Sequence, residues 1–357
     1  MSEKVAVVIL NYNGQRYLEK FLPIVIQHTP EAKIIVADNN SSDNSVEFVL
    51  KTFPSVQLIV LDKNYGFCEG YNRALAQIDA EYYVLLNSDI EVTPCWLSPL
   101  IQLMETNPRI GACQPTLLAW HHRNEFEYAG AAGGFLDILG YPFCRGRIFH
   151  TLEEYKKQYS TAPIFWASGA CLCVRAQLYH QLGGLEKLFF AHMEEIDFCW
   201  RLQNYGFAVW HCAESIVYHV GGGTLHKTNP QKTFLNFRNG LALLFKNLPI
   251  SYLFPVIFAR LILDGIAGIQ FLFNKKFSDT WAILRAHFAF YQMIPQLWKI
   301  RTKSSTRSLK NAYPSLFYRV PIVWKYFIEQ KKYFSELDFN NFNRAYFAYT
   351  KTSLYNL

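Results

Sequence analysis

The chain has 357 residues, of which 51% are hydrophobic and 18% charged, so it is long enough to bury a large core. Its charge is uneven, because 19 Lys and Arg stand against 23 Asp and Glu through Phe245, and 16 against 5 from Lys246 onward. The acidic front excludes nucleic acid as the partner of that region, and the basic end predicts a separate interaction role.

Short apolar runs of strand length alternate with helical stretches over the first ninety residues. Strands are predicted over 5–10, 33–37, 57–61 and 82–86, and helices over 16–28, 45–53 and 69–78. This alternation predicts an α/β fold with a mostly parallel central sheet and helices on both faces. Right-handed crossovers then place the carboxyl end of every strand on one edge, where ligands bind.

Polar residues follow each predicted strand at that edge. The four turns read Asn11-Tyr12-Asn13, Asp38-Asn39-Asn40, Asn64-Tyr65-Gly66 and Asn87-Ser88-Asp89. A carboxylate in the position of Asp89 can hold a divalent cation, which can in turn hold a diphosphate, although it can equally cap the next helix. The first turn has one glycine and is neither a dinucleotide-binding nor a Walker loop, so phosphate charge would need a metal or basic side chains.

In order, these blocks resemble the motifs of family 2 glycosyltransferases. The similarity begins at residues 7–14, and Asn87-Ser88-Asp89 resembles the D-x-D-type metal motif in the N-x-D form of rhamnosyltransferase-like bacterial members. It continues through Gly169-Ala170-Cys171, Gly183-Gly184-Leu185 and residues 194–202, and ends near 218–223. The resemblance therefore covers roughly residues 3–245.

The resemblance implies a GT-A fold and an inverting transfer of a sugar from a UDP-, dTDP- or GDP-sugar. The residues that it places beside the donor are Asn11, Asn13, Asp38, Asn40, Asn64, Gly66, Phe67, Asn72, Asn87, Ser88 and Asp89. Asp89 matches the metal ligand, and His219 matches a later histidine that can complete the coordination of Mg²⁺ or Mn²⁺.

An inverting transfer also needs a base for the acceptor hydroxyl. Family members often carry Glu-Asp at that place, where this chain has Glu194-Glu195. By this resemblance Glu195 is the candidate base, with Asp197 second and Glu194 beside them. Alternatively, the three carboxylates form an acidic first turn that the helix dipole favours.

The chain is predicted to divide into a GT-A domain at 1–245 and a basic, aromatic-rich helical tail at 246–357. Residues 120–165 match no family block and are predicted to be a loop-rich insert near the acceptor groove. Residues 250–273 have the length of a membrane span, but Arg260 and Asp264 interrupt them one turn apart, where they can pair. An interfacial or half-buried helix is therefore favoured over a span.

A basic run in the tail suits an anionic lipid surface, and the alternative is a helical appendage or an oligomer contact. Its members are Lys299, Arg301, Lys303, Arg307 and Lys310. The eight cysteines form no Cys-x-x-Cys pair, and the apolar run at the amino terminus is too short for a signal peptide. We therefore expect a cytoplasmic protein, peripheral on the inner face of the cytoplasmic membrane.

The sequence predicts a metal-dependent glycosyltransferase of the hexosyltransferase class (EC 2.4). Its acceptor would be a glycan or a lipid-linked glycan in cell-surface polysaccharide assembly. One alternative is a nucleotidyltransferase, which normally has a glycine-rich basic loop after its first strand. The other is a catalytically degenerate sugar-binding scaffold subunit, which would have lost Asp89 or the Glu195 region.

Overall fold

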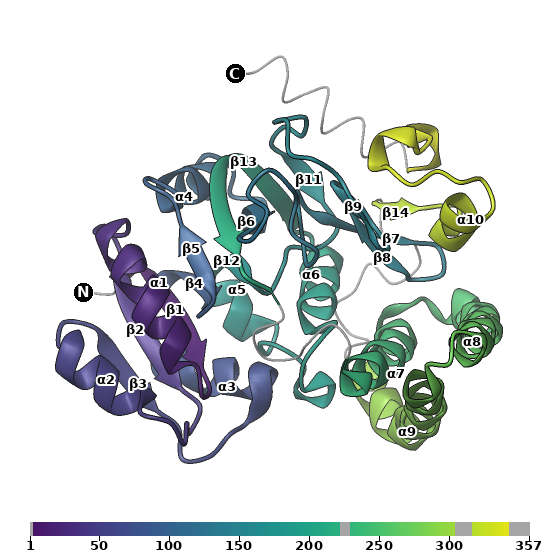
Figure 1. Ribbon diagram of the computed structural model, residues 1–357, viewed down its shortest axis with the longest axis horizontal. Helices are drawn as coiled ribbons and strands as arrows, with labels where there is room; N and C mark the ends of the chain where they lie inside the picture. Colours follow the sequence, from purple (N-terminus) through teal and green to yellow (C-terminus); the bar gives the residue numbers. More distant parts are fainter. Residues whose placement is uncertain (1–2, 222–228, 304–315, 343–357) are drawn as a thin grey trace.

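The computed structural model describes residues 3–221, 229–303 and 316–342. Arg307 and Lys310 of the predicted basic run lie outside these residues, as do positions 222 and 223 of the last family block. Figure 1 shows the sheets beside a group of three carboxyl-terminal helices, which lie on the side of the molecule opposite α2 and β3.

The first ninety residues form strands and helices within a few residues of the predicted bounds. The elements are β1 (Glu3–Asn11), α1 (Gln15–Gln27), β2 (Lys33–Asp38), α2 (Ser45–Thr52), β3 (Gln57–Val60), α3 (Gly66–Leu75), β4 (Ala80–Asn87) and β5 (Ile90–Val92). Helix α1 buries Leu18, Phe21, Leu22 and Val25, whose spacing of three and four residues makes one apolar face. Strands β1 and β4 are almost wholly buried, as expected for a sheet covered on both faces.

The central sheet has the strand order β11-β13-β6-β12-β4-β1-β2-β3, and β5 pairs with β13. Its further elements are α4 (Leu97–Thr106), β6 (Ile110–Ala119), β11 (Ala162–Ile164), β12 (Cys171–Arg175), α5 (Ala176–Gln181), η1 (Lys187–Phe189), α6 (Glu194–Asn204) and β13 (Ala208–His219). Strands β3, β2, β1 and β4 run parallel, and β12 enters antiparallel between β4 and β6. The predicted α/β class with a mostly parallel sheet and carboxyl-terminal helices is confirmed.

The segment predicted as a loop-rich insert contains a second, smaller sheet. Its strands are β7 (Gly134–Asp137), β8 (Pro142–Cys144), β9 (Arg147–Ile148), β10 (Thr151–Leu152) and β14 (Phe317–Tyr318), in the order β10-β9-β8-β7-β14. The tail therefore returns to the insert through β14, and the backbone N–H of Ile322 donates to Asp137 at 2.6 Å. The remaining short elements are α10 (Ile322–Phe327), η3 (Phe334–Glu336) and η4 (Phe339–Asn341).

Three long helices follow the sheets: α7 (Pro230–Asn247), α8 (Ile250–Phe273) and α9 (Phe277–Lys303). One hydrophobic core runs from the central sheet and its helices into these three helices, since Trp200 belongs to the same buried cluster as Leu244, Leu253 and Phe290. The boundary predicted at residue 245 falls within α7. Whether the two parts act as separate domains stays a prediction.

Candidate active site

The ends of three parallel strands meet at one edge of the central sheet. Asn11 of β1 pairs in register with Asp38 of β2, and Leu10 pairs with Asn87 of β4. The structure therefore brings together the polar turns that follow β1, β2 and β4. The apolar residues of each strand hold that strand in the core, so the polar turn at its end is fixed in place.

A hydrogen-bonded cluster joins the first two turns. The Asn11 amide donates to Asp38 at 2.9 Å, and the backbone N–H and hydroxyl of Ser41 donate to the Asp38 carboxylate at 2.7 and 2.6 Å. Asn13 has a positive φ of 51° and accepts from the backbone N–H of Ser42. The buried Asn11 Oδ1 has no hydrogen-bond partner among the described residues, so this oxygen can accept a bond from a ligand.

The third turn is tied to the second by Asn39. Its side chain donates to Asn64 at 3.1 Å and to the Gly66 carbonyl at 2.9 Å, and it accepts from the backbone N–H of Tyr65. Gly66 has a φ of +72°, and a Cβ there would lie 2.5 Å from the ring of Phe190. A side chain at position 66 is thus excluded both by the backbone conformation and by space. Asn40 follows with a positive φ of 63°.

Phe67 and Asn72, which were predicted to lie beside the nucleotide-sugar, make contacts within the protein. The backbone N–H of Phe67, at the start of α3, donates to the Phe190 carbonyl at 3.2 Å. The side chain of Asn72 bonds both the carbonyl and the N–H of Leu185, at 2.8 and 2.9 Å, and accepts from the Tyr179 hydroxyl at 2.7 Å. Asn72 therefore fastens α3 to the loop before η1.

Asp89 lies in contact with His219, the last residue of β13. The distance from Asp89 Oδ1 to His219 Nε2 is 3.2 Å, and both residues are buried. On the other side of the imidazole, Nδ1 lies 3.4 Å from Oε1 of Glu127. The sequence analysis missed Glu127, which reaches the site from the insert and follows no recognisable motif.

The two carboxylates control the charge of the histidine between them. Burial would lower the pKa of His219, but the charges of Asp89 and Glu127 outweigh it and raise that pKa well above its ordinary value. Burial likewise works to raise the pKa of Asp89 and of Glu127, and the His219 charge holds both below their usual range. A divalent cation would compete with the proton on this imidazole.

The donor set of Asp89 and His219 fits Mg²⁺ or Mn²⁺. Two neighbouring ligands of an octahedral ion, each about 2.1 Å from it, lie about 3 Å apart. In the structure, Oδ1 and Nε2 lie 3.2 Å apart as a hydrogen-bonded pair, and at this separation one ion could contact both atoms. Glu127 faces the other ring nitrogen, as the partner of a metal-binding histidine usually does, and leaves Nε2 for a metal.

Glu195, the second residue of α6, lies close to the same edge. A Cβ added at Gly169 would lie 3.6 Å from the Glu195 Cβ, and the next residue, Ala170, accepts a hydrogen bond from the Asn87 backbone. The half-buried Glu195 has an Oε2 atom with no hydrogen-bond partner among the described residues. Burial raises the pKa of Glu195 to about 7. Burial and the neighbouring Glu195 charge raise the pKa of Glu194 well above its usual range.

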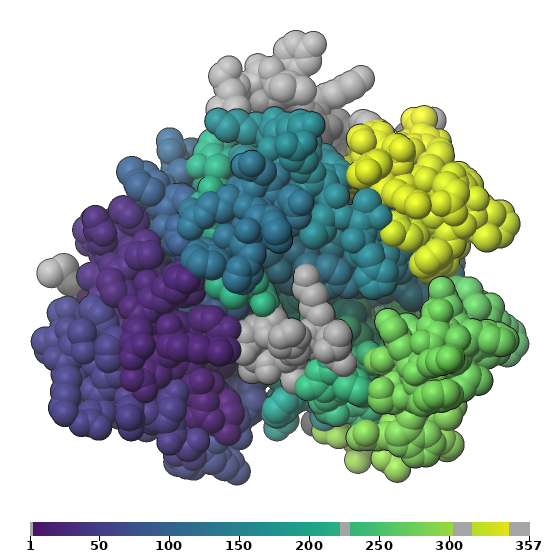
Figure 2. All heavy atoms as spheres, viewed as in Figure 1, coloured from purple at the N-terminus to yellow at the C-terminus, as the bar shows by residue number. Residues whose placement is uncertain are grey.

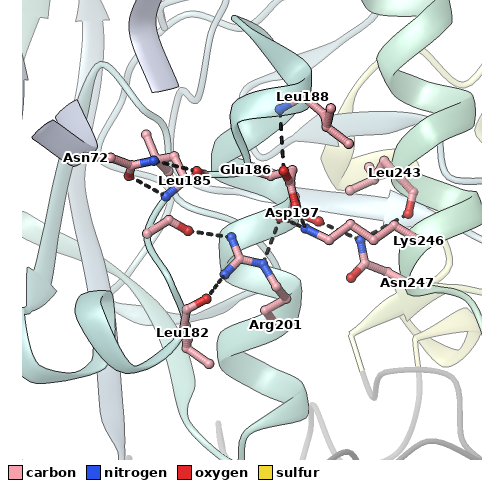
Figure 3. A network of polar contacts seen from close by, with 11 residues as sticks. Asn72, Leu182, Leu185, Glu186, Leu188, Asp197, Arg201, Leu243, Lys246 and Asn247 are labelled. Atoms are coloured by element: carbon pink, nitrogen blue, oxygen red, sulfur yellow. Dashed lines mark hydrogen bonds and ion pairs between the residues drawn. The ribbon is translucent and has the colours of Figure 1, made fainter. Parts of the chain in front are cut away.

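Asp197 is held in a network of charges, which Figure 3 shows. Its Oδ2 lies 2.8 Å from both Arg201 Nε and Lys246 Nζ, and its Oδ1 accepts from Asn247 at 2.8 Å. Burial alone would raise the pKa of Asp197, but Lys246 and Arg201 hold it below its ordinary value. Since both oxygens are engaged, Asp197 ties α6 to the end of α7.

A strained loop leads into α6. Phe190, His192 and Met193 all have positive φ values, of 66°, 68° and 73°. The buried Asn239 of α7 holds this loop, because its amide donates to the carbonyls of Phe189, Ala191 and His192 at 2.8–3.0 Å. Such strain persists only where surrounding contacts impose it, and it is concentrated at functional sites.

The chain is similar to known proteins in sequence and in fold. Residues 6–175 match the protein family described as Glycosyl transferase family 2. The N-acetylglucosaminyl-diphospho-decaprenol L-rhamnosyltransferase of Mycobacterium tuberculosis is 26% identical over 244 residues, which make up 63% of this chain and 78% of that protein.

Solved structures share the fold at low sequence identity. GalNAc-T7 with UDP, GalNAc and Mn²⁺ superposes with a TM-score of 0.54 at 14% identity, covering 70% of this chain and 49% of the other. S. aureus TarS 1-349 in complex with UDP-GlcNAc gives a TM-score of 0.51 at 14% identity, covering 84% of this chain and 88% of the other. These likenesses show a GT-A-like fold. The match of residues 6–175 to the Glycosyl transferase family 2 model confirms the family resemblance seen in that part of the sequence.

Proposed function

We propose that the protein transfers a hexose, with inversion at the anomeric carbon, from a nucleoside-diphosphate sugar to a glycan or lipid-linked glycan. The observation that carries this proposal is the position of Glu195. Its carboxylate has an oxygen without a partner among the described residues, and it lies in the first turn of α6, beside the strand end that leads to Asp89. A base and a candidate metal site thus share one edge of the sheet.

The donor would lie across the strand ends. The nucleobase and ribose would lie against the cluster of Asn11, Asp38 and Asn13. This cluster offers amide and carboxylate oxygens as hydrogen-bond acceptors and has backbone N–H groups beside them. Asn87, Ser88 and Asp89 follow at the end of β4, where the diphosphate would lie. Asn40, Asn64, Gly66 and Phe67 shape the wall of the site, and Asn72 holds that wall from behind.

Glu195 would act as the general base. The acceptor oxygen forms a bond to the anomeric carbon while the bond from that carbon to the diphosphate oxygen breaks. Glu195 accepts the proton of the acceptor hydroxyl, and the nucleoside diphosphate leaves. A pKa of about 7 keeps this carboxyl partly ionised near neutral pH and makes it an effective proton acceptor. Glu194 would remain protonated beside it.

Asp89 and His219 would hold Mg²⁺ or Mn²⁺. When bound, the ion would neutralise the charge that grows on the departing diphosphate. Among the described residues, no group of three or more His, Cys, Asp and Glu side chains gathers to hold a metal. We therefore expect oxygens of the donor and water to complete the coordination, and the Mn²⁺ in the GalNAc-T7 complex supports this choice of metal.

A lipid-linked acceptor and a location on the inner face of the cytoplasmic membrane complete the proposal. The name of the mycobacterial relative describes an acceptor attached to a polyprenyl diphosphate. In addition, α8 is long and apolar enough to cross a membrane, and most of it is exposed. Both observations support a part in cell-surface polysaccharide assembly.

The products distinguish this proposal from its alternatives. Purified protein is incubated with a panel of nucleotide-sugars and Mn²⁺, and the released nucleotide is identified. A glycosyltransferase releases a nucleoside diphosphate, and a nucleotidyltransferase releases or consumes pyrophosphate. Binding without any release, unchanged by Asp89→Ala, would favour the sugar-binding scaffold and contradict our proposal.

A further inference from the structure

Helix α8 buries its charged residues and exposes its apolar ones, which is the reverse of the usual surface helix of a soluble protein. Its buried stripe contains the only two charged residues of the helix, Arg260 and Asp264, next to Leu253, Val256 and Gly268. The opposite stripe is apolar, and each of its members is between 50% and 82% exposed. These members are Phe254, Phe258, Ile262, Ile266, Ile269 and Phe273. Since residues three and four apart share one face of a helix, this stripe is continuous.

The buried charges fasten α8 to the rest of the protein. Arg260 Nη1 donates to the Leu139 carbonyl at 3.1 Å, and its guanidinium lies 3.9 Å from the centre of the Tyr141 ring. Asp264 lies 3.5 Å from Arg260 and 3.3 Å from His287 of α9. A helix that crossed a bilayer would have to leave these partners and carry both charges into hydrocarbon, which is costly.

Helix α9 continues the apolar surface. Phe277, Trp281, Leu284, Phe288, Tyr291 and Trp298 repeat mainly at three and four residues, and each is between 44% and 66% exposed. Figure 1 shows α8 and α9 side by side at the outer margin of the molecule. In Figure 2 this region forms a broad outer surface of its own. We call these two exposed stripes the hairpin face. Apolar patches of this extent mark interaction sites on soluble proteins.

The charges around the hairpin face are of one sign. Between residues 250 and 302 the exposed charged side chains are Lys275, Lys276, Arg285 and Lys299. Of the two acidic residues in this range, Asp264 is buried by the contacts above, and the half-buried Asp279 accepts a hydrogen bond from the Thr233 hydroxyl at 2.6 Å. An apolar surface rimmed by lysine and arginine complements an anionic bilayer, which offers hydrocarbon below and phosphate above.

We infer that the hairpin face docks the enzyme flat on an anionic lipid bilayer, with α8 and α9 lying in the interface and neither helix crossing it. The aromatic side chains enter the boundary between head groups and acyl chains, while the lysines remain among the phosphates. This inference deepens the proposed membrane location by naming the surface and its orientation. It rests on the proposed function only for the nature of the acceptor.

Vesicle flotation with the full-length protein tests the inference. The probes are phosphatidylcholine vesicles with and without phosphatidylglycerol. Phe258→Glu with Ile266→Glu places two carboxylates on the hairpin face and should weaken binding at least about tenfold. Leu50→Glu with Val60→Glu is the matched control, because these residues are 59% and 55% exposed on α2 and β3, away from the hairpin. The control should bind like the unchanged protein.

Three results would overturn the inference. One is equal vesicle binding by the hairpin variant and the control variant. Another is an absence of binding together with a dimer that Phe258→Glu dissociates, which would make a second copy the occupant. The third is resistance to alkaline extraction, which would indicate a span. High salt should release part of the protein, since it screens only the lysine contribution.

Donor hydrolysis in solution separates this inference from the proposed function. The hairpin variant should keep the donor hydrolysis of the unchanged protein, because its substitutions lie outside the site. Vesicle binding without release of a nucleoside diphosphate from any donor would contradict the proposed function and leave the docking surface standing. Release of a nucleoside diphosphate without vesicle binding would contradict the docking surface and leave the proposed function standing.

Discussion

Two carboxylates on α6 lie two residues apart in surroundings that give them different properties. Asp197 is fully buried between Arg201 and Lys246, so its carboxylate is ionised and pairs with both cations. Among the residues that the structure describes, no cation pairs with Glu195, and burial raises its pKa to about 7. The same helical turn thus holds one carboxylate that maintains the structure and one that can accept a proton.

Substitution of each residue should separate these roles. Glu195→Gln should lower turnover by about 10²–10⁴-fold, because an amide cannot accept the proton, and should leave donor affinity nearly unchanged. Asp197→Asn should lower the free energy of unfolding by about 3 kcal/mol, because Arg201 loses the charge of Asp197 and Lys246 keeps only its pairing with Glu186. Single-turnover kinetics and urea denaturation measure the two effects. A dead but stable Asp197→Asn enzyme beside an active Glu195→Gln enzyme would move the base by two residues.

The raised pKa of Glu195 predicts opposite effects of pH on activity and stability. Turnover should rise with pH through about 7, because the base must be ionised. The folded pKa lies above the unfolded one, so the stabilisation is complete below about pH 4.3 and is lost as pH rises through about 7. Rate profiles and urea denaturation between pH 5 and 8 check this. Glu195→Gln should flatten both curves, and a parallel rise of stability and activity would contradict the assignment.

Glu127 should matter for metal binding although we do not assign it as a ligand. Glu127→Gln removes the carboxylate facing His219 Nδ1 and should weaken Mn²⁺ affinity about 10–100-fold. Glu125→Gln is the control, because Glu125 is exposed two residues away. Calorimetric titration with Mn²⁺ measures both proteins, and equal affinities would show that Glu127 does not position the histidine.

At the scale of elements, Asn239 connects α7 to the strained loop before α6. Asn239→Ala should lower turnover and reduce the free energy of unfolding by about 1–3 kcal/mol, because the carbonyls of Ala191 and His192 lose the Asn239 amide as a donor. Asn229→Ala removes the side chain that caps α7, so it should cost about 1 kcal/mol and leave turnover unchanged. Equal turnover in the two variants would mean that the loop needs no support from Asn239.

Local patterns explain which elements could be predicted from the sequence. Apolar strand runs and their polar turns indicated β1 to β4 and the edge where Asn11, Asp38 and Asn87 meet. The spacing of Arg260 and Asp264 likewise predicted their pairing, which the structure confirms. The direction in which this pair points depends on Leu139 and Tyr141, more than 120 residues earlier in the chain. No local pattern carries that information.

The candidate site was predictable to the same extent. Asp89, His219 and Glu195 stand in ordered blocks, so their common edge followed from the family resemblance. Glu127 has no motif around it and reaches His219 only through the folding of the insert. The pairing of Asp197 with Arg201 follows helical spacing, but its contact with Lys246 spans 49 residues and has no local signal.

At the scale of the whole molecule, the carboxyl-terminal helices complete the core of the catalytic part. Phe245 packs against Phe290 with ring centres 5.9 Å apart, and Arg301 donates to the Phe245 carbonyl at 2.9 Å. A chain ending at Leu248 should therefore unfold at a lower urea concentration than the full chain and bind nucleotide-sugar more weakly. Equal midpoints of unfolding would instead support a self-contained domain at residues 1–245.

The inverted helix α8 has a consequence for how the enzyme meets its acceptor. A protein held flat on a bilayer shares a thin layer with any lipid-linked acceptor, and the search between them becomes two-dimensional. Their effective concentration is then set by surface density, in the way that a short linker raises the concentration of two tethered partners. A weak acceptor subsite suffices under such confinement. Loss of the hairpin face would therefore impair transfer to a membrane-bound acceptor far more than transfer to a short, soluble analogue.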